Sequence, residues 1–418
     1  MPSTFLAALA TLGPPDDLAA APTSTPRPNV NAHIHLPPNF SAFETTAQAL
    51  ELAQAQNVRV LGASNYYDYS IYADFADGAA ARGIFPLFGL EIISLVDDLV
   101  KRGIKANDPG NPGKVYVCGK GITRFDPLTA KAARLLQTIR DNDSVRTAAV
   151  AERLATVFRA AGLDTGLDAA AIKARVVARH GVPLETVSLQ ERHVAQAFQE
   201  VLFERVSEGQ RPALLGRAFG AVPKSAPTDA IGVQNEIRSQ LMKSGKPAYV
   251  PETFVDFDHA YQLTLALGGI PCYPVLADGA SPMTAYEDPV EGLIADLKAR
   301  GIPSAEFIPP RNHPDVLTRY VHALRDAGLF VTAGTEHNTL ELLPLAPTCL
   351  GGAPIPDDVQ EIFWEGACVI AAHQYLTLNG GMGFVDEAGL PNPSYGSAAE
   401  RIAAFRQIGE RVIGHYVL

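Results

Sequence analysis

Cysteine and positive charge are both scarce in this sequence. The four cysteines among 418 residues are far apart, and no two form a CxxC pair: Cys118, Cys272, Cys349 and Cys368. This spacing argues against a zinc ribbon and a disulfide framework. No apolar run approaches the roughly 20 residues that cross a bilayer. Lys and Arg number 34 against 45 Asp and Glu, a net charge of −11. We therefore expect no nucleic-acid partner and no membrane partner, because phosphate groups attract positive charge.

The N-terminal segment also lacks the basic region of a secretory signal. Phe5 to Ala10 are mostly apolar, but no Lys or Arg precedes them. We expect a short helix here and a cytoplasmic protein. Residues 1–27 are rich in Pro, Ala, Thr and Ser from residue 13 onward, and we expect them to form a surface lead-in.

Short β-rich runs alternate with helical runs along much of the chain. Hydrophobic residues make up 47%, which is ample for a large core. Seven strands are predicted, near residues 29–36, 58–64, 84–93, 114–118, 269–275, 305–308 and 329–334. Alternation with helices predicts βαβ units and a parallel sheet, either closed into a barrel or doubly wound. In both architectures ligands bind at the carboxyl ends of the strands.

Residues 126–250 interrupt this alternation. They are mostly helical, and near 190–206 the apolar residues keep the spacing of a buried helix face: Val194, Phe198, Val201 and Leu202. We interpret the segment as an insertion, either a cap over the strand ends or a solvated helical decoration. The barrel then comprises residues 28–125 and 251–345. Residues 346–418 complete it with two helices, near 356–376 and 397–415.

Candidate metal ligands lie at three of the predicted strand ends. His33 and His35 are two residues apart on the first strand, so their side chains point to the same side. Glu91 lies at the end of the third strand, and Glu336 and His337 follow the last. Imidazole is the commonest metal ligand, and mixed His/Glu sets suit Zn²⁺, Mn²⁺ or Fe²⁺. These residues predict a divalent transition metal at the mouth of the sheet.

The order of these motifs resembles the PHP (polymerase and histidinol phosphatase) family over the predicted barrel segments. The family's HxH matches His33 and His35, and its Gly-x-Glu matches residues 89–91. Its closing Gly-Ser-Asp-x-His is similar to Gly-Thr-Glu-His at 334–337. The resemblance implies a distorted (β/α)7 TIM-like barrel with a helical insertion, and a metal-dependent phosphoesterase with up to three metals. In this chain it implies one metal held by His33, His35, Glu91 and Glu336.

Three other family positions lack their histidine. The family's Thr-Asp-His corresponds to Ser-Asn-Tyr at 64–66, its fourth-strand histidine falls at Tyr116, and another falls at Tyr273 or Val275. Neutral Tyr is a poor ligand because its pKa is about 10. About one metal per chain is therefore expected. Two nearby cysteines are substitute ligands or, as we favour, buried small hydrophobes: Cys118 and Cys272.

Further residues are candidates for proton transfer and substrate contact. His337 or Tyr66 would protonate the leaving group. Lys120, Arg124 and Arg311 follow predicted strand ends, where a cation would contact a phosphate; each is otherwise an ordinary surface cation.

Three functional hypotheses follow from these residues. The first is a metal-dependent hydrolase, a phosphoesterase that acts on a small molecule through metal-activated water. The second is an amidohydrolase-like reaction on a similar barrel, although no Lys stands where a metal-bridging carbamate would need one. The third is a catalytically inactive barrel that binds a ligand or a partner.

Overall fold

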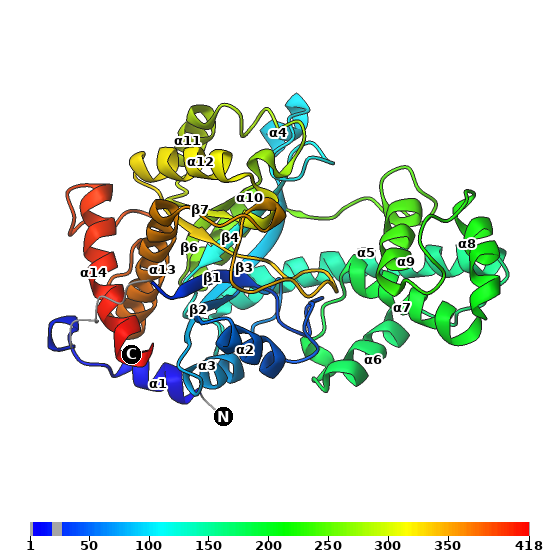
Figure 1. The fold of residues 1–418 in the computed structure, drawn as a ribbon, viewed down its shortest axis with the longest axis horizontal. Helices are drawn as coiled ribbons and strands as arrows, with labels where there is room; N and C mark the ends of the chain where they lie inside the picture. Colours follow the sequence, from blue (N-terminus) through cyan, green and yellow to red (C-terminus); the bar gives the residue numbers. More distant parts are fainter. Residues whose placement is uncertain (1–2, 19–26, 418) are drawn as a thin grey trace.

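The computed structural model describes residues 3–18 and 27–417, with a strongly curved sheet at the centre (Figure 1). Its strand order is β1–β2–β3–β4–β6–β7–β8. These strands span Asn29–Ile34, Val58–Ala63, Phe85–Leu95, Lys114–Lys120, Ile270–Val275, Ser304–Phe307 and Phe330–Ala333. The two-residue β5, Val255–Asp256, pairs with β3. The two ends of the sheet almost meet, because Ile34 bridges to Glu336 beyond β8. This nearly closed seven-stranded barrel confirms the predicted distorted TIM-like α/β fold.

One strand departs from the predicted parallel sheet. β1, β2 and β3 pair in parallel, as do β6, β7 and β8, but β4 is antiparallel to both β3 and β6. The connection between β3 and β4, which contains α4 (Asp97–Arg102), returns at the same end of the sheet (Figure 1). Lys120 therefore pairs with Gly89, and Lys114 with Leu95 near the end of β3. The carboxyl end of β4 thus points away from the barrel mouth.

Helices cover the outside of this sheet. Those following barrel strands are α2 (Thr46–Ala55), α3 (Tyr72–Ala80), α10 (Phe257–Ala266), α11 (Val290–Ala299) and α12 (Pro314–Asp326). Polar side chains cap the first turns of α2 and α10: Thr45 accepts a hydrogen bond from the Gln48 amide, and Asp256 accepts one from the His259 amide. The predicted C-terminal helices are α13 (Asp357–Leu378) and α14 (Ala398–Val417). α13 lies so close to β8 that a Cβ at Gly366 would be 2.1 Å from the Val331 carbonyl oxygen.

The short helix expected near the N-terminus is α1 (Thr4–Ala10), which lies beside α3 (Figure 1). Part of the lead-in predicted for residues 1–27 falls outside the described residues. No helix in the described ranges combines the length and apolar character needed to span a bilayer.

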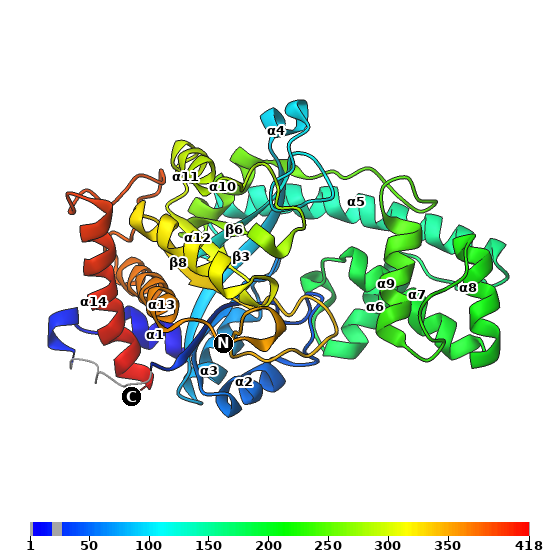
Figure 2. The same cartoon turned by 45° about the horizontal axis from the view of Figure 1, so that its top comes forward.

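Residues between β4 and β5 form a helical lobe on one side of the barrel (Figures 1 and 2). Its helices are α5 (Ala130–Ala160), α6 (Ala169–His180), α7 (Glu191–Arg205), α8 (Arg211–Phe219) and α9 (Ala230–Ile237). α5 belongs to both parts: Leu136 packs in the barrel core, whereas Phe158 packs in a separate core formed by the lobe. One continuous helix therefore connects the lobe to the barrel.

Candidate metal centre

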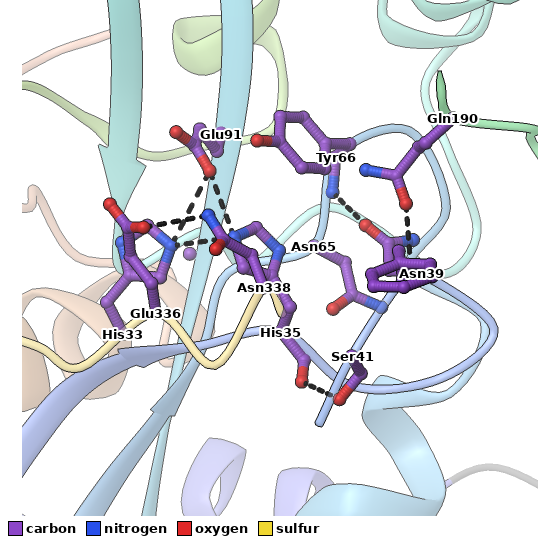
Figure 3. A network of polar contacts seen from close by, with 12 residues as sticks. His33, His35, Asn39, Ser41, Asn65, Tyr66, Glu91, Gln190, Glu336 and Asn338 are labelled. Carbon is purple, nitrogen blue, oxygen red and sulfur yellow. Dashed lines mark hydrogen bonds and ion pairs between the residues drawn. The ribbon is translucent and has the colours of Figure 1, made fainter. Parts of the chain in front are cut away.

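Two histidines at the end of β1 and one glutamate of β3 converge inside the barrel (Figure 3). His33 lies in β1 and His35 directly follows it, so their side chains project to the same side. Glu91 lies in the middle of β3, which ends at Leu95, two residues beyond the predicted end. The Nε2 atoms of His33 and His35 are 3.3 Å apart. Glu91 Oε2 lies 3.7 Å from His33 Nε2 and 3.0 Å from His35 Nε2.

These three atoms have the spacing of ligands around one first-row metal ion. Ligands held about 2.1 Å from an ion at tetrahedral angles lie about 3.4 Å from one another. His33, His35 and Glu91 are 1%, 0% and 3% exposed, and Glu91 Oε2 has no hydrogen-bond partner among the described residues. A buried carboxylate oxygen is costly unless a cation or donor compensates it. The three side chains therefore fit a divalent metal.

Behind His33 lies a buried ion pair that the sequence did not reveal. Glu306, on β7, has one oxygen 2.6 Å from His33 Nδ1, and its other oxygen pairs with the Lys120 ammonium. Burial alone would raise the pKa of Glu306, but Lys120 and His33 outweigh it and lower that pKa to about 2. The ionised carboxylate accepts from His33 Nδ1 and leaves the Nε2 lone pair facing Glu91. Such a carboxylate–histidine contact orients a metal ligand.

A second group of possible ligands also contains His33, but it is less suited to a metal ion than the first group. His33, Cys118 and Glu306 also bring ligand atoms close together. The Lys120 ammonium already neutralises Glu306, however, and would repel a metal cation there. Burial raises the pKa of the Cys118 thiol well above its ordinary value, which keeps the thiol protonated. The geometry therefore favours one metal site, at His33, His35 and Glu91.

Glu336 lies beside this site, but its carboxylate has other partners. Its Oε1 accepts from Arg311 over 2.9 Å, its Oε2 pairs with the second nitrogen of that guanidinium, and Asn338 donates to Oε2 over 2.7 Å. Burial would raise the pKa of Glu336, but Arg311 lowers it. The loop approaches β1 closely enough that a Cβ at Gly334 would be 2.3 Å from the His33 Cβ. The structure thus brings Glu336 to the site as the partner of Arg311.

His337 and Tyr66 occupy different environments. The Nδ1 of His337 accepts from the Thr335 hydroxyl over 2.8 Å, and its Nε2 donates to the Leu343 carbonyl over 2.9 Å. Burial lowers its pKa, so the ring is held neutral with both nitrogens engaged. Tyr66 instead stacks on His35, with ring centroids 4.9 Å apart. Burial, and next the charge of Glu91, raise the pKa of Tyr66 well above its ordinary value. Its hydroxyl therefore stays protonated beside the candidate metal ligands.

The three cations predicted to contact substrate are dispersed by the fold. Lys120 ends the antiparallel β4 and is buried against Glu306 rather than exposed at the mouth. Arg124 follows the same strand end and pairs with Glu387 at a separate cavity. Arg311 remains near the candidate metal ligands and is partly exposed. Of the three, only Arg311 lines the cavity beside Glu91.

Two cavities meet above the candidate ligands. One, of about 310 Å³, is lined by Glu91, Glu336 and Arg311 together with loops of the barrel mouth. The other, of about 140 Å³, lies between the barrel and the helical lobe. Three residues line both cavities: Tyr116, Arg192 and Asn338. The lobe thus contributes to the surroundings of the site.

The sequence analysis did not identify two residues of this region, Glu306 and Arg192. A carboxylate within the otherwise apolar run Ala305 to Ile308 is a signal that could have identified Glu306. No local pattern distinguishes Arg192 from other arginines of the helical segment, because its position at the cavity depends on how the lobe docks.

Asp143, a residue of α5, lines the smaller cavity. Its raised pKa predicts that the free energy of unfolding depends on pH. Burial raises its pKa to about 7, although Arg146 opposes the shift. The folded protein then keeps a proton that the unfolded chain releases, so stability falls as pH rises from about 4 to 7. We expect Asp143→Asn to raise the free energy of unfolding by about 1–2 kcal/mol more at pH 8 than at pH 5. Urea unfolding at both pH values measures this, with the exposed Asp141→Asn as control. An equal gain at both would contradict the prediction.

Comparisons with known proteins bear on the fold. No protein-family model and no curated protein sequence matches this chain. An amidohydrolase from Chromobacterium violaceum, solved with bound sulfate and no metal, is 19% identical, with a TM-score of 0.49; the match covers 80% of this chain and 96% of that one. A Bifidobacterium adolescentis protein, assigned as a metal-dependent phosphoesterase, is 16% identical with the same coverage and a TM-score of 0.50. At 16% identity, the second match shows a shared fold and leaves the reaction open.

Proposed function

We propose that this protein is a metal-dependent hydrolase that cleaves a phosphoester of a small molecule. The observation that carries the proposal is the cluster of His33, His35 and Glu91 beside a cavity of about 310 Å³. Catalytic metal sites commonly combine three protein ligands with one open position, whereas structural sites close all four. A Zn²⁺, Mn²⁺ or Fe²⁺ ion, one per chain, suits two imidazoles and a carboxylate.

A metal bound at this site would lower the pKa of a water molecule from 15.7 toward about 7 and polarise a substrate oxygen. The protein's own residues have supporting roles. Glu306 orients the ring of His33 through Nδ1. Tyr66 presents a protonated hydroxyl that donates to substrate and does not act as a base. Glu336 holds the Arg311 guanidinium at the cavity, where it contacts a substrate anion.

Three observations support a phosphoester as the substrate. The motifs at residues 33–35 and 89–91 resemble the PHP family, whose members include phosphoesterases. The Arg311 guanidinium lines the cavity beside Glu91, and guanidinium matches phosphate in geometry and charge. A protein of similar fold is assigned as a metal-dependent phosphoesterase.

A carbamate-dependent amidohydrolase reaction is disfavoured by the environment of Lys120. This lysine lies inside the barrel, on β4, close to the carboxylate that contacts His33. Burial would lower its pKa, but Glu306 raises it above the ordinary value. The amine is therefore held as an ammonium ion, which does not form a carbamate, and an anionic carbamate would face the Glu306 carboxylate.

Two measurements test the proposal: the metal content of the purified protein and the class of substrate that it cleaves. Protein purified without chelator is expected to carry about one transition metal per chain. It should release phosphate from p-nitrophenyl phosphate or from a panel of small phosphoesters. Chelation should abolish the activity, and Zn²⁺, Mn²⁺ or Fe²⁺ should restore it. Failure to bind any of these ions would contradict the metal site. Metal-dependent cleavage of amides, with no phosphate release from any phosphoester, would contradict the substrate class.

A further inference from the structure

The smaller cavity, between the barrel and the helical lobe, is rich in positive charge. Five cations line it: Lys114, Arg146, Arg192, Arg238 and Lys243. Three carboxylates accompany them: Asp143, Glu191 and Glu252. The whole chain carries a net charge of −11, so this local excess of cations is opposite in sign to the rest of the molecule. A concave surface of one charge sign concentrates ligands of the opposite sign.

Four of the five cations share three carboxylates, because Lys114 lies 3.0 Å from Asp108 as well as close to Glu252. Glu191 lies 2.7 Å from Arg146, 2.9 Å from Lys243 and 3.9 Å from Arg238. Glu252 lies 3.4 Å from Lys114 and 4.0 Å from Arg146. Asp143 adds less negative charge at neutral pH, because burial raises its pKa to about 7. The cavity therefore keeps uncompensated positive charge.

Arg192 carries most of this excess. Among the described residues it has neither a salt-bridge partner nor a side-chain hydrogen bond. Its guanidinium carbon lies 5.9 Å from the centroid of the Phe40 ring. Burial, and next the charge of Arg238, lower its pKa to about 10. Arg238 itself has a buried Nε without a partner. Two neighbouring guanidiniums with unused donors form a recognition site for an anion.

The docking of the lobe positions Arg192. Gln190, immediately before α7, accepts a hydrogen bond from the Phe40 amide over 2.6 Å, and it lies close to Tyr66 (Figure 3). Arg192 follows two residues later and lines both cavities. A ligand that reaches Arg192 from the barrel mouth can therefore extend from the metal ligands into the smaller cavity.

We propose that Arg192 and Arg238 bind an anionic group of the substrate that is remote from the bond being broken, and that this group is a phosphate. A phosphate dianion supplies a counter-charge for Arg192 and an acceptor for the unpartnered Nε of Arg238, whose ion pair with Glu191 is 3.9 Å long. The inference rests on the proposed function and deepens it: the reacting group lies at the metal site, and the lobe selects substrates bearing a second phosphate.

Calorimetric titration of inorganic phosphate into the full chain tests this site. Loss of charge-assisted hydrogen bonds predicts that Arg192→Gln weakens phosphate binding by about 10- to 100-fold. Arg238→Gln should also weaken phosphate binding. Arg192→Lys should weaken it by an intermediate factor, because Lys keeps the positive charge but lacks the planar guanidinium that donates two parallel hydrogen bonds. The control is Arg159→Gln, on the same lobe, which is exposed and lies about 20 Å along α5 from Arg146. Thermal unfolding checks that each variant is folded.

Repeating the titration in a Glu91→Gln background separates this inference from the proposed function. Phosphate binding should persist there and should still depend on Arg192, whether or not the protein proves to be a hydrolase. In the active protein, Arg192→Gln should raise KM and leave kcat near wild type. The inference is overturned if Arg192→Gln binds phosphate normally, if Arg159→Gln weakens binding equally, or if Glu91→Gln abolishes binding. Acetate binding as tightly as phosphate would overturn the assignment to phosphate.

Discussion

Glu91→Gln is expected to lower the metal affinity of this protein by more than about 100-fold. Loss of outer contacts to metal ligands already costs about 10- to 100-fold, and Glu91 offers its oxygen directly to the site. The amide keeps the size of the side chain. Among the described residues, it removes the only negative charge that lies within 4 Å of both histidine Nε2 atoms. Metal content after dialysis, measured by elemental analysis, and hydrolysis under the same conditions should fall together.

Glu336→Gln is the matched control for this prediction. Glu336 is also a buried glutamate and lies close by, but Arg311 and Asn338 occupy its carboxylate. We expect this variant to retain metal and to lose affinity for an anionic substrate as Arg311 loses its anchor. If Glu336→Gln loses the metal and Glu91→Gln retains it, the ligand is Glu336, as the family resemblance implies, and the assignment from the structure is wrong.

Lys120→Met is expected to lower the free energy of unfolding by about 3–5 kcal/mol. Removing one partner of a buried ion pair leaves the other charge uncompensated, and Lys120 and Glu306 are 1% and 0% exposed. The carboxylate of Glu306 would keep only the contact with His33 and a weak one with Thr332. Guanidinium unfolding at pH 7 measures the loss. Lys131→Met, at an exposed lysine of α5, should change stability little.

The double variant Lys120→Met, Glu306→Gln distinguishes this explanation from simple loss of packing. Glu306→Gln replaces the buried carboxylate by a neutral amide, so most of the penalty for an unpaired buried charge disappears. The double variant should therefore be more stable than Lys120→Met alone. Additive losses from the two substitutions would contradict a coupled ion pair. Glu306→Gln alone should also weaken metal binding by about 10- to 100-fold, because His33 loses its orienting carboxylate.

The elements of the barrel could be predicted because they depend on local patterns. The alternation of apolar strands and amphipathic helices located all seven main strands, and the two predicted C-terminal helices correspond to α13 and α14. The direction of β4 could not be predicted in this way. A strand has the same local pattern in either direction, and only the path of the chain through α4 makes β4 antiparallel. This one reversal explains why Lys120 and Arg124 lie away from the barrel mouth.

The sequence alone determined the placement of His33 and His35 on one side of a strand, because side chains alternate with a period of two along β structure. It also identified Glu91 as a candidate partner. Only the tertiary structure decided which carboxylate pairs with which histidine or cation. Glu306 reaches His33 across 273 residues of chain, and Arg311 pairs with Glu336 instead of leaving it free for a metal. The physical reason is that a buried charge takes the nearest opposite charge, and nearness is set by the closure of the barrel rather than by separation along the chain.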